Sequence, residues 1–203
     1  MSSVIDTKGV ATTKKDKFLI GFNLDALTQE ILFNIHSEMQ SYYKNTINSP
    51  TINKDTSLPY HMTIIGGIKI DSNLSTGYMT GALEKLKPFQ KDAMIPKLID
   101  IESAQLNGNM LGIRLKFEDG TYVITGCPES NMSLAKMLGV PHFNFDAPRH
   151  VTLCEVWGGL RSMDKVWLSF KKLTDLHKSK ILELELTPYV WKDTKEGWRQ
   201  WIA

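Results

Sequence analysis

Two short segments of the chain repeat the same order of residue types and contain side chains that are suited to acid–base chemistry. Residues 59–64 read Pro-Tyr-His-Met-Thr-Ile, and residues 148–153 read Pro-Arg-His-Val-Thr-Leu. Each segment has a proline, a histidine two residues later and a threonine two residues after the histidine. The chain has only five histidines, so chance is a poor explanation for two such matches. The candidate catalytic residues are His61, Thr63, His150 and Thr152.

Both motifs lie in segments that are typical of β-strands. Successive side chains of a strand point to opposite faces, so His61 and Thr63 share one face while Met62 and Ile64 share the other. The second motif alternates in the same way. Each strand is therefore expected to bury an apolar face and to present a polar pair. If the two halves of the chain are related by pseudo-twofold symmetry, the two polar pairs face each other across a cleft.

Two imidazoles on opposite sides of a cleft suit the cleavage of a phosphodiester. One ring can accept a proton from the attacking hydroxyl or water while the other donates a proton to the leaving oxygen. Threonine hydroxyls can hydrogen-bond the non-bridging phosphate oxygens and stabilise the charge that develops in the transition state. The sequence has no His-x-His, no His-Asp pair and no carboxylate cluster with the spacing of a two-metal site. The predicted mechanism therefore uses no metal and no cofactor.

The segments around the motifs predict alternating strands and helices. Residues 18–24 form an apolar run typical of a strand, and Asp25 can cap the helix that follows. The Asn107-Gly108 and Asp119-Gly120 turns predict an antiparallel meander. Further elements are expected as strands at 61–68, 95–106, 110–117, 121–124, 150–157 and 181–190 and as helices at 74–87, 130–138 and 163–173. Strands joined by hairpins and mixed with helices indicate an α+β protein with antiparallel sheets.

Length and composition exclude several classes of protein. The 203 residues are 42% hydrophobic and 23% charged, as in globular proteins, and no apolar stretch approaches the roughly 20 residues of a membrane-spanning helix. A formal net charge of +2 is far from the basic balance of proteins that coat long nucleic acids. We expect a flexible tail at 1–16, a single two-lobed domain at 17–203, no membrane partner and no long nucleic-acid partner.

The cysteines and the N-terminal segment bear on the cellular compartment. Cys127 and Cys154 lack the spacing of zinc ligands, and the first residues lack the apolar core of a secretory signal. The expected compartment is the cytoplasm, with free thiols. Cys154 follows Thr152 by two residues on the same strand face, where a packed thiol is expected rather than a nucleophile. His36 and His177 are expected on the surface.

Four further residues are candidates for contacting a substrate. Tyr60 and Arg149 precede the two histidines, and Arg149 can bind a phosphate at the rim of the site; a solvent-facing charge explains it equally well. Trp191 and Trp198 lie in a C-terminal segment where tryptophans stand beside lysine and arginine. Such segments stack on nucleobases, but they also complete a core or form the contact of a homo-oligomer.

The paired His-x-Thr motifs in the two halves of an α+β chain of this length resemble those of the two-histidine (2H) phosphoesterase superfamily. The resemblance covers the organisation from about residue 18 to residue 190, and its specific part is the two motifs. It implies a bilobal fold with two antiparallel sheets in a pseudo-twofold arrangement around a central cleft and with helices on the outside. It assigns the family's catalytic positions to His61, Thr63, His150 and Thr152.

Together, the motifs and the resemblance predict a metal-independent phosphodiesterase acting on a small nucleotide or a short oligonucleotide, linear or cyclic. The superfamily includes phage anti-CBASS enzymes that destroy cyclic oligonucleotide alarm signals. The Asn, Lys and Ile usage of this chain favours a viral enzyme of this kind, acting on cyclic di- or trinucleotides in the host cytoplasm. The alternatives are a module that sequesters a nucleotide without turnover and a structural protein in which the cleft is vestigial.

Overall fold

The computed structural model describes residues 14–44, 50–53, 58–89, 98–106, 109–118, 131–141, 150–157 and 160–201. Within these ranges the chain forms four α-helices and eight strands, so the predicted α+β class is confirmed. None of the helices in these ranges is both long and apolar enough to cross a membrane.

The elements alternate along the chain. In order they are β1 (Lys15–Leu24), α1 (Ala26–Tyr43), β2 (Thr51–Asn53), β3 (His61–Asp71), α2 (Ser75–Leu86), the short 3-10 helix η1 (Lys87–Phe89), β4 (Leu98–Gln105), β5 (Met110–Phe117), α3 (Asn131–Leu138), β6 (Val151–Trp157), α4 (Leu160–Ile181), β7 (Leu186–Thr194) and β8 (Gly197–Gln200). The sheet order is β4-β5-β6-β3-β1-β7-β8, and β2 pairs with the far end of β6. Every pairing is antiparallel.

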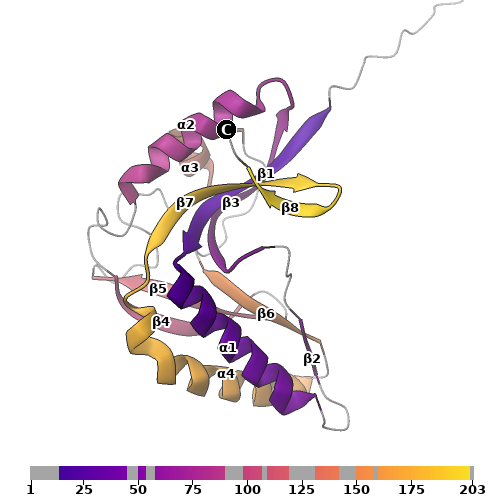
Figure 1. Ribbon diagram of the computed structural model, residues 1–203, viewed down its shortest axis with the longest axis vertical. Coiled ribbons are helices and arrows are strands. Elements are labelled where there is room, and N and C mark those ends of the chain that lie inside the picture. The colour runs from indigo at the N-terminus through magenta and orange to yellow at the C-terminus, as the bar shows by residue number, and fades with distance from the viewer. Residues whose placement is uncertain are drawn as a thin grey trace, which may run out of the picture.

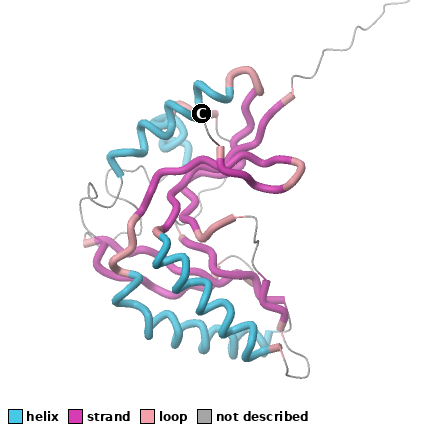
Figure 2. The backbone as a smooth tube through the Cα atoms, in the orientation of Figure 1, coloured by secondary structure: helices cyan, strands magenta, loops and turns pink. Residues whose placement is uncertain are grey.

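The curled sheet consists of two groups of strands that meet at its centre (Figures 1 and 2). The strands β3, β1, β7 and β8 form one group, which packs against α2 and α3, and β6, β5, β4 and β2 form the other, which packs against α1 and α4. The two groups join where β3 pairs with β6, with Met62 opposite Val151. The resemblance to the 2H phosphoesterases implies two sheets, but this pairing connects the two groups, so the structure has one continuous sheet.

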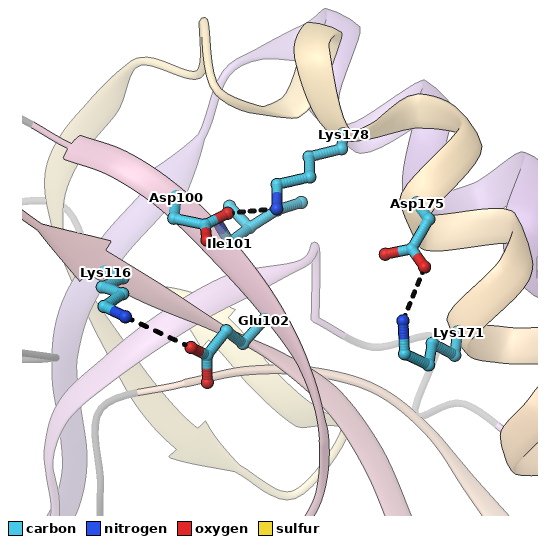
Figure 3. Close-up of polar contacts among 7 residues, drawn as sticks. All are labelled: Asp100, Ile101, Glu102, Lys116, Lys171, Asp175 and Lys178. Carbon is cyan, nitrogen blue, oxygen red and sulfur yellow. Dashed lines mark hydrogen bonds and ion pairs between the residues drawn. The ribbon is translucent and has the colours of Figure 1, made fainter.

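Helix α4 attaches to the second group through charged as well as apolar residues. Lys178 of α4 forms an ion pair with Asp100 of β4 (Figure 3). Lys116 of β5 lies 3.7 Å from Glu102 of β4, which links the two neighbouring strands. An ion pair therefore ties the C-terminal part of α4 to β4.

The β1–α1 unit forms largely as its sequence predicts. Alternate residues of β1 are buried, and the Asp25 side chain caps α1 by accepting a hydrogen bond from the Thr28 amide at 2.9 Å. The three- and four-residue spacing of apolar residues predicts one buried face for this helix, made of Leu27, Ile31, Ile35, Met39 and Tyr42. The middle three are buried as predicted, but Leu27 and Tyr42 are 53% and 70% exposed. His36, predicted on the surface, is 6% exposed because it lies on the face of α1 that packs inward.

Several element boundaries differ from the predicted ones. Residues 15 and 16 belong to β1 rather than to a tail, because they pair with the end of β3. Helix α4 extends to Ile181, so β7 begins at Leu186 and not at residue 181. Thr174 is 1% exposed and continues the buried stripe of Val166 and Phe170, so a polar residue hides the helical period in the sequence. The hairpin that adds β8 is not predicted.

Some predicted features lie outside the described residues. These are residues 1–13 of the tail, both predicted turns, the strand at 121–124, Cys127 and Arg149.

Candidate active site

The four motif residues lie together on one face of the sheet, at the junction of β3 and β6. Because Met62 pairs with Val151, continuing the antiparallel register by one residue in each direction sets His61 opposite Thr152 and Thr63 opposite His150. Cross-strand partners share a face, so all four side chains point the same way. Diagonal neighbours in such a pair, as the two histidines are, have Cα atoms about 7–8 Å apart.

Burial distinguishes the two faces at this junction. Met62 and Val151 are 1% and 0% exposed and belong to the apolar core. The four motif residues are half-buried on the opposite face, which we call the site face. The alternation thus has the form predicted from the sequence. Solvent therefore reaches the site face.

Each motif strand is flanked by a strand that approaches it closely at a glycine. Gly21 of β1 pairs with Thr63, and Gly112 of β5 pairs with Thr152. A Cβ atom on either glycine would lie 2.2 Å or 2.3 Å from the carbonyl oxygen of the residue before the threonine. A shift in strand register directly precedes both glycines, between Ile20 and Gly21 in one half and between residues 111 and 112 in the other. The two halves therefore repeat one local arrangement.

This repeat is missed when only the histidine motifs are compared. The glycines occur in Leu-Ile-Gly-Phe at residues 19–22 and in Met-Leu-Gly-Ile at residues 110–113. A glycine inside an apolar strand often marks a bulge or a close backbone approach. The signal is therefore present in the sequence, but the partner of each glycine is set only by the sheet.

The imidazole of His61 is held by two contacts. Its Nδ1 donates a hydrogen bond to the carbonyl oxygen of Pro59 at 2.8 Å, and its ring centre lies 4.8 Å from that of Trp191 at an interplanar angle of 44°. Trp191 belongs to β7, so this contact spans β1, where Gly21 provides no side chain to obstruct it. With the proton on Nδ1, a neutral ring has its lone pair on Nε2, the nitrogen that can take part in proton transfer.

The two tryptophan candidates have different environments. Trp191 is 1% exposed and packs against His61 and Tyr189, whose ring centre is 5.1 Å away. The prediction that Trp191 stacks on a substrate base is therefore wrong, because its ring is covered. Trp198 of β8 is half-buried, with the Lys17 ammonium 5.3 Å from the ring centre. Burial raises the pKa of Tyr189, so its hydroxyl stays protonated and can donate a hydrogen bond.

Tyr60 supports the site but does not face a ligand. Its side chain is 3% exposed within the apolar core, and burial raises the pKa of its hydroxyl. The prediction that Tyr60 contacts substrate is therefore wrong. Its backbone is anchored to α1, because its amide donates to Gln29 Oε1 at 2.7 Å and its carbonyl accepts from Gln29 Nε2 at 2.5 Å. This anchor positions the start of β3 and hence His61.

Two polar residues of the site face were not singled out from the sequence. Ile113 pairs with Val151, so Arg114 is the next residue along β5 and lies beside His150 on the site face. Asn23 pairs with His61, and its Oδ1 atom is buried with no hydrogen-bond partner among the described residues. Both residues occupy alternate positions of strands, so their convergence on the motifs depends on strand order.

A cavity of about 330 Å³ opens beside His61 and Thr152. Its other lining residues are Asn53, Leu58, Pro59, Leu153, Cys154 and Glu155. Cys154 is itself 1% exposed, and burial raises the pKa of its thiol to about 12. The predicted packed thiol is confirmed. Among the described residues, no group of three or more His, Cys, Asp or Glu could hold a metal ion.

The fold, but no family, is identified by comparison with known proteins. No protein-family model and no curated protein matches the chain. The structure is similar to the crystal structure of ATU0111 from Agrobacterium tumefaciens str. C58, a conserved protein of unknown function, with a TM-score of 0.52 and 11% sequence identity. The match covers 98% of this chain and 91% of that chain. The two proteins share an α+β fold built on a curled antiparallel sheet.

Proposed function

We propose that the protein is a metal-independent phosphodiesterase with the bilobal fold of the 2H phosphoesterases. Its substrate is a small nucleotide or a short oligonucleotide, with cyclic di- and trinucleotides among the candidates. The observation that carries the proposal is the β3–β6 register, which sets two His-Thr pairs diagonally on one half-exposed face. The repeated glycine pairs, Gly21 with Thr63 and Gly112 with Thr152, support a pseudo-twofold relation between the halves.

The two histidines are assigned different roles. The carbonyl oxygen of Pro59 accepts the Nδ1 proton of His61, and the electron-rich Trp191 ring lies beside it, so a proton-carrying His61 is well accommodated as the general acid. The second histidine, His150, is then assigned as the general base, which deprotonates the attacking hydroxyl or water.

The remaining site residues bind the phosphate. The hydroxyls of Thr63 and Thr152 flank the space between the histidines and can donate to non-bridging oxygens. The Arg114 guanidinium adds a cation suited to phosphate on the side of His150. Together these donors stabilise charge that builds up as the phosphodiester is attacked.

The test is turnover of a substrate panel by the protein and by single histidine variants. The panel contains 2′,3′-cyclic nucleotides, 2′-5′ oligoadenylate and cyclic dinucleotides, assayed in EDTA with product analysis. His61→Ala and His150→Ala should each lower the rate by about 10²- to 10⁴-fold with unchanged circular dichroism, because each removes one proton-transfer group. His177→Ala, in α4 and away from the site, is the matched control and should keep the full rate.

Each possible result of this assay bears on the proposal. Wild-type rates in either His61→Ala or His150→Ala would overturn it. Loss of turnover in the chelator would overturn the metal-independent mechanism. If a panel member binds tightly but no product forms, the protein sequesters a nucleotide and does not cleave it. A bell-shaped dependence of the rate on pH is expected from one acid and one base, and a flat profile between pH 5 and 9 would contradict that pairing.

A further inference from the structure

The cavity beside His61 and Thr152 has two further polar lining residues, which belong to two neighbouring strands. Asn53 of β2 pairs with Glu155 of β6, and both side chains are exposed and line the cavity. Glu155 lies three positions after Thr152, so a regular strand would turn the two side chains to opposite faces. The register shift in the β5–β6 pairing leaves Leu153 and Cys154 both buried, which brings Glu155 to the site face.

The cavity lining also includes apolar residues. Leu58 and Pro59 lie directly before the His61 strand and contribute side chains without charge. The lining therefore combines a proton-transfer group and a hydroxyl, from His61 and Thr152, with an amide and a carboxylate, from Asn53 and Glu155. Small-molecule sites have volumes of about 300–1,000 Å³. At about 330 Å³, the cavity matches one nucleoside rather than a long strand.

The carboxylate of Glu155 restricts which base the cavity can bind. An ionised carboxylate only accepts hydrogen bonds, and its two oxygens are satisfied best by two adjacent N–H donors. Among the common bases, guanine alone has two such donors side by side, at N1 and at the 2-amino group. Its O6 atom is an acceptor that the amide of Asn53 can satisfy. Adenine and cytosine each present a ring acceptor next to their amino group.

We propose that this cavity is a guanine subsite, in which Glu155 accepts from N1–H and the 2-amino group while Asn53 donates to O6. Leu58 and Pro59 cover the base. The inference rests on the proposed function, because a guanine bound here sets its attached phosphate beside His61 and Thr152. The preferred substrate is then a guanine-containing nucleotide or oligonucleotide that is cleaved at the phosphate next to that base.

The proposal is tested by binding, independently of turnover. Guanosine, inosine and adenosine 3′-monophosphates are titrated calorimetrically into the protein. Inosine keeps N1–H and O6 but lacks the 2-amino group, so it should bind about tenfold more weakly than the guanine nucleotide. Glu155→Gln should abolish this discrimination. Glu30→Gln removes an equal charge from exposed α1 and should leave the discrimination unchanged.

The outcomes separate this proposal from the proposed function. Equal affinities for the three nucleotides, or full discrimination in Glu155→Gln, would overturn the guanine subsite even if the panel assay shows phosphodiester cleavage. Glu155-dependent guanine binding without turnover of any substrate would support the subsite and overturn the phosphodiesterase.

Discussion

The sharpest test of the site geometry replaces the glycines opposite the two motif threonines. In Gly21→Ala the new Cβ atom would lie 2.2 Å from the Met62 carbonyl oxygen, and in Gly112→Ala it would lie 2.3 Å from the Val151 carbonyl oxygen. Ordinary contact begins at 3.4 Å, so the neighbouring backbone has to move by about 1.1–1.2 Å. Both obstructing atoms are backbone oxygens of the residues between each histidine and its threonine, which cannot move without moving the site.

Such a displacement has two measurable consequences. Forced overpacking of this kind costs about 1–3 kcal/mol of the free energy of unfolding. A misplacement of about 1 Å in a catalytic arrangement can lower the rate by about 10²-fold. We therefore expect both alanine variants to fold with reduced stability and to lose about two orders of magnitude in kcat/KM. The effects should be of similar size, because the two glycines occupy equivalent places in the two halves.

The assay combines urea denaturation with turnover of the best panel substrate. Gly81→Ala in α2 is the matched control, because its Cβ atom would have no atom within 4 Å. It should keep full activity and gain about 0.5–1 kcal/mol of stability, since alanine is the better helix former. If Gly112→Ala has wild-type stability and turnover, the strand register described for β5 and β6 is wrong.

Two further predictions concern the elements that position the site. Asp25→Ala should lower the free energy of unfolding at pH 7 by about 2 kcal/mol, because it removes the cap of α1 and the bond from the Glu185 amide at 3.0 Å. Burial acts to raise the pKa of Asp25, but the bonds from Thr28 and Glu185 outweigh it and leave the pKa below its usual value. The stabilisation by Asp25 is therefore complete above about pH 4 and is lost as the pH falls through the folded-state pKa. The free energies of unfolding of the wild type and of Asp25→Ala should converge in acid. A difference that stays constant with pH would contradict this. Lys192→Ala should lower the free energy of unfolding, measured in urea, by roughly 1–3 kcal/mol, whereas Lys171→Ala should lower it by under about 1 kcal/mol. The reason is that Lys192 pairs at 2.6 Å with Asp16, which is 8% exposed, whereas both partners of the Lys171 pair are exposed. Equal losses of stability in the two variants would contradict the larger contribution of the Lys192–Asp16 pair.

Local patterns in the sequence were sufficient for the parts of the fold that depend on near neighbours. The cap at Asp25 and the alternation in both motifs follow from backbone geometry that a few residues determine. The boundaries of α4 were harder to predict, because Thr174 is buried in a position where the pattern calls for an apolar residue. Whether a polar residue is buried depends on what packs against the helix. The neighbouring residues in the sequence do not show this.

The candidate site shows the same division. The types and spacing of His61, Thr63, His150 and Thr152 are read directly from the chain, and so is the expectation that each pair shares a strand face. Tyr60 and Trp191 have the chemistry of ligand contacts, but the structure buries both rings. Exposure is a property of the packed sheet, so residue type alone could not separate these residues from true contacts.

The sequence by itself determined the chemical groups and the alternation of each strand, because side-chain direction repeats every two residues whatever the strand's partners. Only the tertiary structure decided that β3 pairs with β6, that Arg114 and Asn23 join the histidines, and that a register shift turns Glu155 toward the cavity. These arrangements depend on contacts between residues far apart in the chain. Their register is set by burial of the whole sheet, because a shift of one residue would turn every apolar side chain of a strand to the wrong face.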